Sequence, residues 1–250
     1  MKIRWTGLLL LALLVSGVAG ATEKYVPEEG SAELAKHARR EKIPLDPKLP
    51  NVLIIGDSIS MGYTPYVAKL LRGKANVIHN PGNAQGTTYG RENLATWLGA
   101  KSWQVIHFNW GLHDLKHVKV VGGQKNSDDP KDPQQADLLT YETNLRALVE
   151  QLKATKAKLI FATTTPYPAG VSPFRAPEDA AQYNKVALRI MQANGIKLDD
   201  LYTLILPKLK ELQRPRNVHF SDKGSEVLAQ HVAESILQEL GLPLDVSDKK

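Results

Sequence analysis

The sequence of 250 residues contains no cysteine. Disulfide bonds, thiolate metal sites and a cysteine nucleophile are therefore excluded. Nucleotide-binding motifs are also missing, since neither a Walker A sequence nor a Gly-x-Gly-x-x-Gly run occurs. The formal net charge is +6, but the basic residues are scattered and form no clustered stretch typical of nucleic-acid binding. We therefore expect neither nucleotides nor nucleic acids among the partners of this protein.

Long apolar runs are confined to the N-terminus. Lys2 and Arg4 precede an apolar stretch from Leu8 to Val15, and a small-residue run at 19–21 follows it. These are the three parts of a secretory signal peptide, which predicts that residues 1–21 are removed. The alternative is a permanent N-terminal anchor, but a membrane-spanning helix needs about 20 apolar residues. We expect a secreted or periplasmic protein without stable insertion in a membrane.

The remaining chain divides by composition into a linker, a regular domain and a short tail. Residues 22–50 are polar and rich in proline, and we interpret them as an N-terminal linker with one short helix at 32–41. Residues 51–243 carry the regular pattern of a folded domain, and 244–250 form a polar tail. Within the domain, residues 116–136 are polar and rich in Gly, Asp and Pro, which predicts a surface insertion.

Short apolar runs alternate with amphipathic segments throughout the domain. The run at 52–55 ends at Gly56 and is typical of a strand buried on both faces. The alternation predicts a flavodoxin-like three-layer α/β/α sandwich with a mostly parallel sheet. Ligands of such folds bind at the carboxyl ends of the strands. We expect strands at 52–55, 77–79, 105–108, 159–162 and 196–202, and helices at 67–71, 94–98, 138–152, 178–193 and 224–240.

Polar segments follow the predicted strands at this edge of the sheet. A Gly-Asp-Ser tripeptide ending at Ser58 follows the first strand, residues 80–87 follow the second, and 109–114 follow the third. Residues 218–222 stand just before the last helix. Nucleophilic catalysis by serine needs a base that takes its proton and donors that bind the oxyanion. Ser58 and His219 are candidates for nucleophile and base, because an imidazole titrates near neutral pH.

These four segments resemble the sequence blocks of the SGNH, or GDSL-type, hydrolases. That family has Gly-Asp-Ser, a glycine after the second strand, Gly-x-Asn-Asp after the third strand and Asp-x-x-His before the last helix. The resemblance runs from about Asn51 to Leu240, with Ser58 in the first block and His219 in the fourth. It implies an ester hydrolase that forms an acyl intermediate on Ser58, with His219 as the base and then the acid.

The resemblance also implies an oxyanion hole. The backbone N–H groups of Ser58 and of a glycine after the second strand are its expected donors. We assign this glycine to Gly86, and Gly82 is the alternative. His113 occupies the position of the family's asparagine in the third block, so that either His113 or Asn109 is the expected third donor.

The fourth block departs from the family pattern, because Arg216 stands at the position of the acid. A Ser–His dyad then requires another group to hold the imidazole ring, and we expect a backbone carbonyl near Arg216 in this role. Asp222 follows His219 closely, but we expect it to cap the last helix. Asp57 and Asp114 lie inside the blocks and are further supporting candidates.

A metal site is the competing interpretation of the histidines near the third block. His113 and His117 lie four residues apart, and His107 is the nearest third ligand. A zinc site needs at least three protein ligands around one point, and we expect His107 to be buried within the third strand. We therefore expect no metal ion and no other cofactor.

The expected partner is an ester substrate, either a small molecule or a polysaccharide. The family resemblance favours small acyl groups on carbohydrate, with simple lipid esters second, and export suits a polysaccharide. Two other classes of function stay open. One is an acyltransferase that uses the same serine, and the other is a non-catalytic carbohydrate-binding relative.

Overall fold

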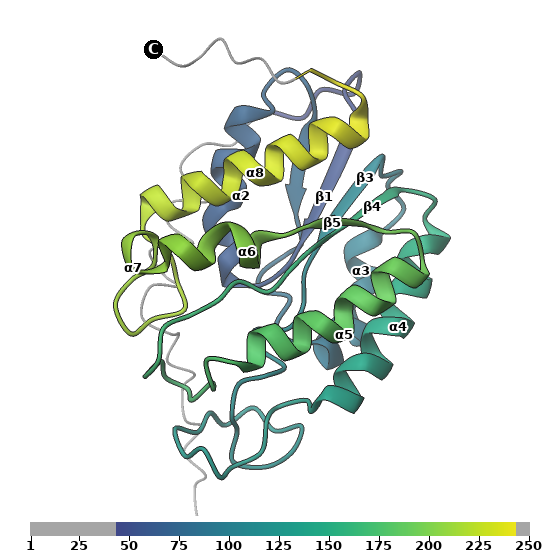
Figure 1. The fold of residues 1–250 in the computed structure, drawn as a ribbon. Helices are drawn as coiled ribbons and strands as arrows, with labels where there is room; N and C mark the ends of the chain where they lie inside the picture. The colour runs from purple at the N-terminus through teal and green to yellow at the C-terminus, as the bar shows by residue number, and fades with distance from the viewer. Residues whose placement is uncertain (1–43, 244–250) are drawn as a thin grey trace, which may run out of the picture.

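Five parallel strands form the centre of the computed structural model, which describes residues 44–243 (Figure 1). Their order across the sheet is β2-β1-β3-β4-β5, and every neighbouring pair is parallel. This is the flavodoxin-like strand order, and it confirms the predicted fold class. The strands are β1 (Asn51–Ile55), β2 (Asn76–His79), β3 (Val105–Phe108), β4 (Lys158–Ala162) and β5 (Lys197–Asp199).

Several predictions made for the ends of the chain fall on residues that the structure does not describe. They are the signal peptide at 1–21, the short helix at 32–41 and the tail at 244–250. Within residues 44–243, none of the helices combines the length and the apolar character that crossing a membrane requires.

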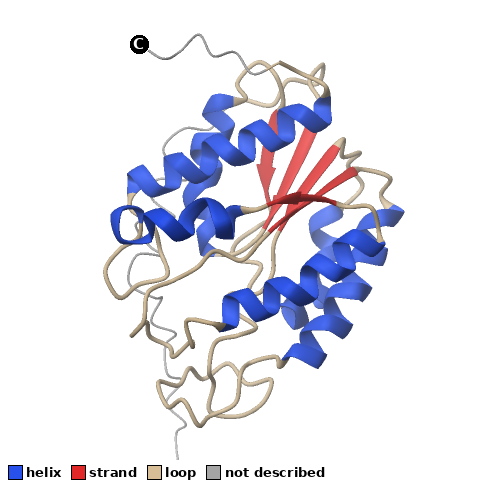
Figure 2. Ribbon diagram, viewed as in Figure 1, coloured by secondary structure: helices blue, strands red, loops and turns tan. Residues whose placement is uncertain are grey.

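Helices cover both faces of the sheet (Figure 2). They bury the alternating side chains of the strands, so that Val52 and Ile54 of β1 belong to one apolar cluster and Leu53 and Ile55 to the other. All four are at most 1% exposed, as the continuous apolar run predicts. One face carries α2 (Ser58–Leu70) and α8 (Asp222–Leu240), and the other carries α3 (Thr87–Leu98), α4 (Leu138–Ala154) and α5 (Asp179–Ala193).

Two helices begin earlier than the apolar pattern predicts. We expected helices at 67–71 and 94–98, but α2 starts at Ser58 and α3 at Thr87. Their first turns are rich in small and polar residues, so hydrophobic periodicity gives no signal there. The start of α2 is instead fixed by Asp57, whose carboxylate accepts a hydrogen bond of 2.9 Å from the backbone N–H of Ile59.

The fifth strand is shorter than the predicted range 196–202. It ends at Asp199, and Asp200 then caps a new helix by accepting from the N–H of Thr203 at 3.2 Å. Three short elements that the sequence did not predict follow in succession. They are α6 (Leu201–Ile205), the 3-10 helix η1 (Leu206–Lys208) and α7 (Leu209–Leu212).

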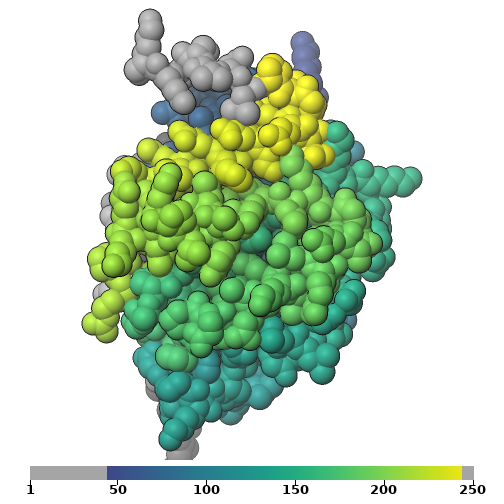
Figure 3. All heavy atoms as spheres, viewed as in Figure 1, coloured from purple at the N-terminus to yellow at the C-terminus, as the bar shows by residue number. Residues whose placement is uncertain are grey.

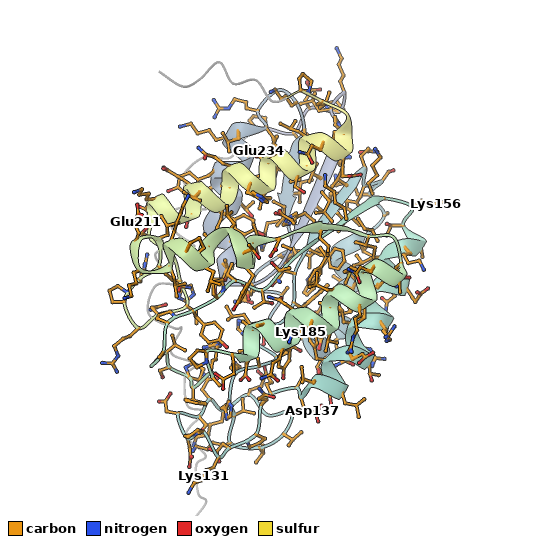
Figure 4. All side chains as sticks on the ribbon, in the orientation of Figure 1. Lys131, Asp137, Lys156, Lys185, Glu211 and Glu234 are labelled. Atoms are coloured by element: carbon orange, nitrogen blue, oxygen red, sulfur yellow. The ribbon has the colours of Figure 1, made fainter. Side chains whose placement is uncertain are left out.

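Residues 116–136 form one end of the molecule, at the bottom of Figures 1 and 3. Lys131 marks the outer part of this insertion in Figure 4. The segment contains only isolated antiparallel bridges, one of which joins His117 to Gln134. Its first residues, 116–118, are buried and tie the insertion to the carboxyl end of β3.

A His–Asp–His network, in which His107 and Asp199 are buried and His231 is partly exposed, fastens α8 to the sheet. Asp199 at the end of β5 binds His107 of β3 at 2.8 Å and His231 of α8 at 2.6 Å. Burial alone would raise the pKa of Asp199, but the hydrogen bonds from the two histidines outweigh it and hold this pKa at about 2. The hydrogen bond to Asp199 raises the pKa of His231 above its ordinary value, which favours the charged imidazolium.

The network predicts how stability depends on pH. The stabilisation from His231 is complete below the unfolded-state pKa of about 6.5 and is lost as pH rises through its raised folded-state pKa. The stabilisation from Asp199 is complete above about pH 3.8 and is lost as pH falls towards 2. Thermal unfolding of the wild-type chain and of His231→Gln should therefore differ most near pH 6 and converge towards about pH 9. If the difference in Tm between the wild-type chain and His231→Gln did not change between about pH 6 and about pH 9, the hydrogen bond of a charged His231 to Asp199 would not be a source of stability.

Candidate active site

Ser58 lies at the carboxyl end of β1, as the first residue of α2. Gly56 allows the sharp turn before it, because a Cβ at Gly56 would lie 2.7 Å from the hydroxyl oxygen of Ser60. Ser58 is only 4% exposed, so its hydroxyl is held in a largely closed environment. A serine at a strand-to-helix turn has its own backbone N–H free of the helix ladder, and this group can serve as an oxyanion donor.

His219 is brought to Ser58 from the far end of the sequence. Its Nε2 lies 2.8 Å from the Oγ of Ser58, and the ring is 2% exposed. The loop that carries it is fixed by Gln213, whose amide donates to the carbonyls of Val218 at 2.7 Å and Pro166 at 3.0 Å. The predicted pair of nucleophile and base is thus within hydrogen-bonding distance.

Asn217 holds the other side of the imidazole ring. Its Oδ1 lies 2.7 Å from Nδ1 of His219 and also accepts the backbone N–H of His219 at 2.9 Å. A backbone N–H can only donate, so the atom between the two groups must be the amide oxygen. Nδ1 therefore carries the ring proton, and the lone pair of Nε2 faces the hydroxyl of Ser58.

The expected backbone carbonyl near Arg216 is thus wrong as the ring holder, and the side chain of Asn217 takes this place. The sequence interpretation missed it because it looked for an acid three residues before the histidine, whereas the amide stands two residues before it. Arg216 itself is exposed and has a left-handed backbone with φ of 53°. This backbone conformation lets the loop turn so that Asn217 folds back onto His219.

Gly86 and the third block lie side by side. Gly86 immediately precedes α3, and a Cβ there would approach the carboxyl group of Asp114 to 3.2 Å. Oδ1 of Asp114 accepts from the backbone N–H of Thr87 at 2.8 Å and from its hydroxyl at 2.5 Å. Gly82, the alternative, is exposed in the preceding turn. The geometry therefore favours Gly86 as the glycine of the second block.

Asp114 is fully buried, and burial raises its pKa to about 7. The hydrogen bonds from Thr87 act in the opposite direction, and the charge of Asp57 adds a smaller increase. Oδ2 of Asp114 has no hydrogen-bond partner within residues 44–243. The carboxyl group therefore fixes the start of α3 beside Gly86 through one oxygen and leaves the other unused.

Of the two candidates for the third oxyanion donor, His113 is favoured because Asn109 already uses its amide protons. Burial lowers its pKa well below the ordinary value, and the nearby charges of Lys116, Arg175 and His219 lower it further. The ring is therefore neutral at neutral pH and retains one N–H group. Asn109 instead donates from its amide nitrogen to the carbonyl of Ala162 at 2.8 Å and to Thr164 at 3.3 Å, which occupies both of its protons.

The remaining candidates have structural roles. Asp57 caps α2, as described above, and Asp222 is the first residue of α8. The expectation that Asp222 caps this helix is wrong, because the hydroxyl of Ser221 accepts the N–H of Gly224 at 3.1 Å. Asp222 in the first turn still stabilises α8 through the helix dipole.

The histidines considered as metal ligands do not meet. His107 is buried in β3 against Asp199, and His117 packs edge-on against Phe174 with ring centroids 4.8 Å apart. Across residues 44–243 the structure brings no three His, Asp or Glu side chains into an arrangement that could hold a metal ion.

Comparisons with known proteins show the family and the fold. The model of the GDSL-like lipase/acylhydrolase family matches residues 54–227. A comparison with curated proteins gives no significant match. Among solved structures, a lipase/acylhydrolase from Enterococcus faecalis is 19% identical with a TM-score of 0.63, covering 79% of this chain and 100% of that one. A catalytic mutant of an acetylxylan esterase from Geobacillus stearothermophilus is 21% identical with a TM-score of 0.62, covering 79% and 97%.

The contacts of Asn217 predict the tautomer of His219. Nitrogen NMR of the wild-type imidazole at neutral pH should show the proton on Nδ1. In Asn217→Ala the ring loses a hydrogen bond of about 1 kcal/mol, so the Nε2–H tautomer should become populated. Asn217→Asp is the matched control, because its carboxylate accepts the same two N–H groups and should keep Nδ1 protonated. A wild-type ring protonated mainly on Nε2 would show that Asn217 does not orient it.

Proposed function

Because the chain belongs to the GDSL-like lipase/acylhydrolase family, we propose that it is a serine esterase that removes small acyl groups from carbohydrate. The observation that supports this most strongly is the hydrogen-bonded series from Ser58 through His219 to Asn217. It contains a nucleophile, a base of the correct tautomer and a group that orients the base, which are the parts that acyl transfer to serine requires.

The first half of the reaction forms an acyl-serine. The hydroxyl oxygen of Ser58 attacks the ester carbonyl carbon while its proton moves to Nε2 of His219. Negative charge develops on the carbonyl oxygen, and the backbone N–H groups of Ser58 and Gly86 and the ring of His113 bind it. His219 then gives its proton to the alcohol oxygen as the bond between this oxygen and the acyl carbon breaks.

The second half releases the acid. His219 takes a proton from a water molecule, whose oxygen attacks the acyl carbon, and the proton passes to Ser58 as the serine leaves. Asn217 keeps the ring in position through both halves, but a neutral amide adds no negative charge beside the imidazolium. Asn217 therefore contributes orientation to the dyad and not a full negative charge.

A carbohydrate ester is proposed as the substrate on two grounds. Acetylxylan esterases appear among the similar structures, although at 18–21% identity this likeness concerns the fold alone. The sequence also predicts a signal peptide at residues 1–21, and an exported enzyme meets polysaccharides outside the cytoplasm. An acyltransferase and a non-catalytic carbohydrate-binding protein are the alternatives.

Replacing the nucleophile tests the esterase proposal. Ser58→Ala and His219→Ala should each lower kcat for a short-chain aryl acetate by at least about a thousandfold, because the two residues act as a unit. Ser102→Ala, an exposed serine far along the chain, is the matched control and should leave kcat unchanged. Stopped assays should show free acetate as the product.

Other outcomes would separate the alternatives. Transfer of the acetyl group to an added oligosaccharide in preference to water would support the acyltransferase. Turnover that persists in Ser58→Ala, or no turnover in the wild-type chain, would contradict the proposed function.

A further inference from the structure

A cleft lies beside Gly86, between the start of α3 and the insertion at residues 116–136. Gln85, Tyr89 and Glu92 line it on the side of α3, and Gln124 and Gln135 line it from the insertion. Gly86 and Asp114 also contribute to its wall. Gly86 is the proposed oxyanion donor, so the cleft borders one of the groups that would bind the ester carbonyl.

The chemistry of the cleft suits a neutral compound with many hydroxyl groups. Its walls contain amides, two carboxyl groups, a phenol and a hydroxyl, and no lysine or arginine of the described residues lines it. Anionic ligands would find no cation there, and an acyl chain would find few apolar side chains. Amides and carboxylates pair with sugar hydroxyls as donors and acceptors, and an aromatic ring offers an apolar side to a pyranose.

Gln85 has a left-handed backbone conformation, which residues other than glycine rarely adopt. Its φ is 50°, and its N–H donates to the Oδ1 of Asn83 at 2.8 Å. A left-handed conformation is unfavourable for a residue with a Cβ atom, and glycine would avoid this strain. Strain of this kind gathers at ligand sites, and here it places an amide side chain on the wall of the cleft directly before Gly86.

On the opposite wall, the amides of Gln135 and Gln124 are hydrogen-bonded to one another. The amide nitrogen of Gln135 donates to the carbonyl of Gly123 at 2.9 Å and to Oε1 of Gln124 at 3.3 Å. This fixes the orientation of the Gln124 amide and leaves its NH₂ group available to a ligand. On the side of α3, the carboxyl group of Asp114 binds Thr87 through Oδ1, and its buried Oδ2 has no partner in the described part of the chain.

We propose that this cleft binds a neutral saccharide unit of the substrate, with the amides of Gln85 and Gln124 contacting sugar hydroxyls from opposite walls. This inference rests on the proposed esterase function. It adds where the sugar part of the substrate binds, which is in the cleft beside Gly86. The insertion at 116–136 then supplies one wall of the substrate site in addition to covering the end of the molecule.

Calorimetric titration of the full-length Ser58→Ala chain tests the cleft without turnover. The ligands are xylotetraose, cellotetraose and chitotetraose, and at least one of them should bind. Adding Gln124→Ala or Gln85→Gly should weaken that binding about tenfold, the effect of one lost hydrogen bond. Gln85→Gly suits the left-handed backbone and should fold, which its Tm can verify. Gln151→Ala, on the exposed side of α4, is the matched control and should bind as tightly as Ser58→Ala alone.

Binding and turnover separate this inference from the proposed function. Absence of binding by all three oligosaccharides, or affinity unchanged in both glutamine variants, would overturn the saccharide site even if the wild-type chain hydrolyses aryl acetate. Saccharide binding that depends on the two glutamines, together with no hydrolysis of any acetate ester, would support the cleft and reject the esterase.

Discussion

The hydrogen bond between Ser58 and His219 depends on the packing of the first described helix against the last. Ser58 opens α2 and His219 stands three residues before α8, and these two helices lie side by side on one face of the sheet (Figure 1). Their shared apolar cluster sets the separation of the two side chains. Contacts between residues distant in sequence thus produce the distance of 2.8 Å between Nε2 of His219 and Oγ of Ser58. The His107–Asp199–His231 network adds a polar attachment of α8 to the same sheet.

The amide of Asn217 in place of an acid changes how the base is supported. A carboxylate both orients an imidazole and stabilises its charged form with a full negative charge, whereas an amide oxygen orients the ring and stabilises the charged form only through its weaker dipole. The oxyanion side shows a parallel change, since His113 stands where the family has an asparagine and is kept neutral by burial. Asn217 thus supplies its hydrogen bond from the position after that of the family's acid, and the ring of His113 replaces an amide.

Much of the fold and the central pair of the site could be predicted from the sequence. The strands were predictable because their apolar runs are buried on both faces, and Ser58 and His219 because they stand in recognisable blocks. Asn217 could not be assigned, since its role comes from a backbone turn at Arg216 that brings it back to His219. The early starts of α2 and α3 were missed because capping and packing, and not periodicity, determine them. The insertion at 116–136 has no periodic pattern, so its part in the cleft beside Gly86 appears only in three dimensions.

Covalent trapping of the nucleophile tests the central claim most directly. A fluorophosphonate reacts with a serine that an adjacent base has activated, and mass spectrometry of the digested protein locates the adduct. We expect one adduct per wild-type chain, on the peptide that contains Ser58, and almost no adduct in the His219→Ala variant. An unlabelled wild-type chain, or an adduct on another serine, would contradict the assignment of Ser58 and His219 as nucleophile and base.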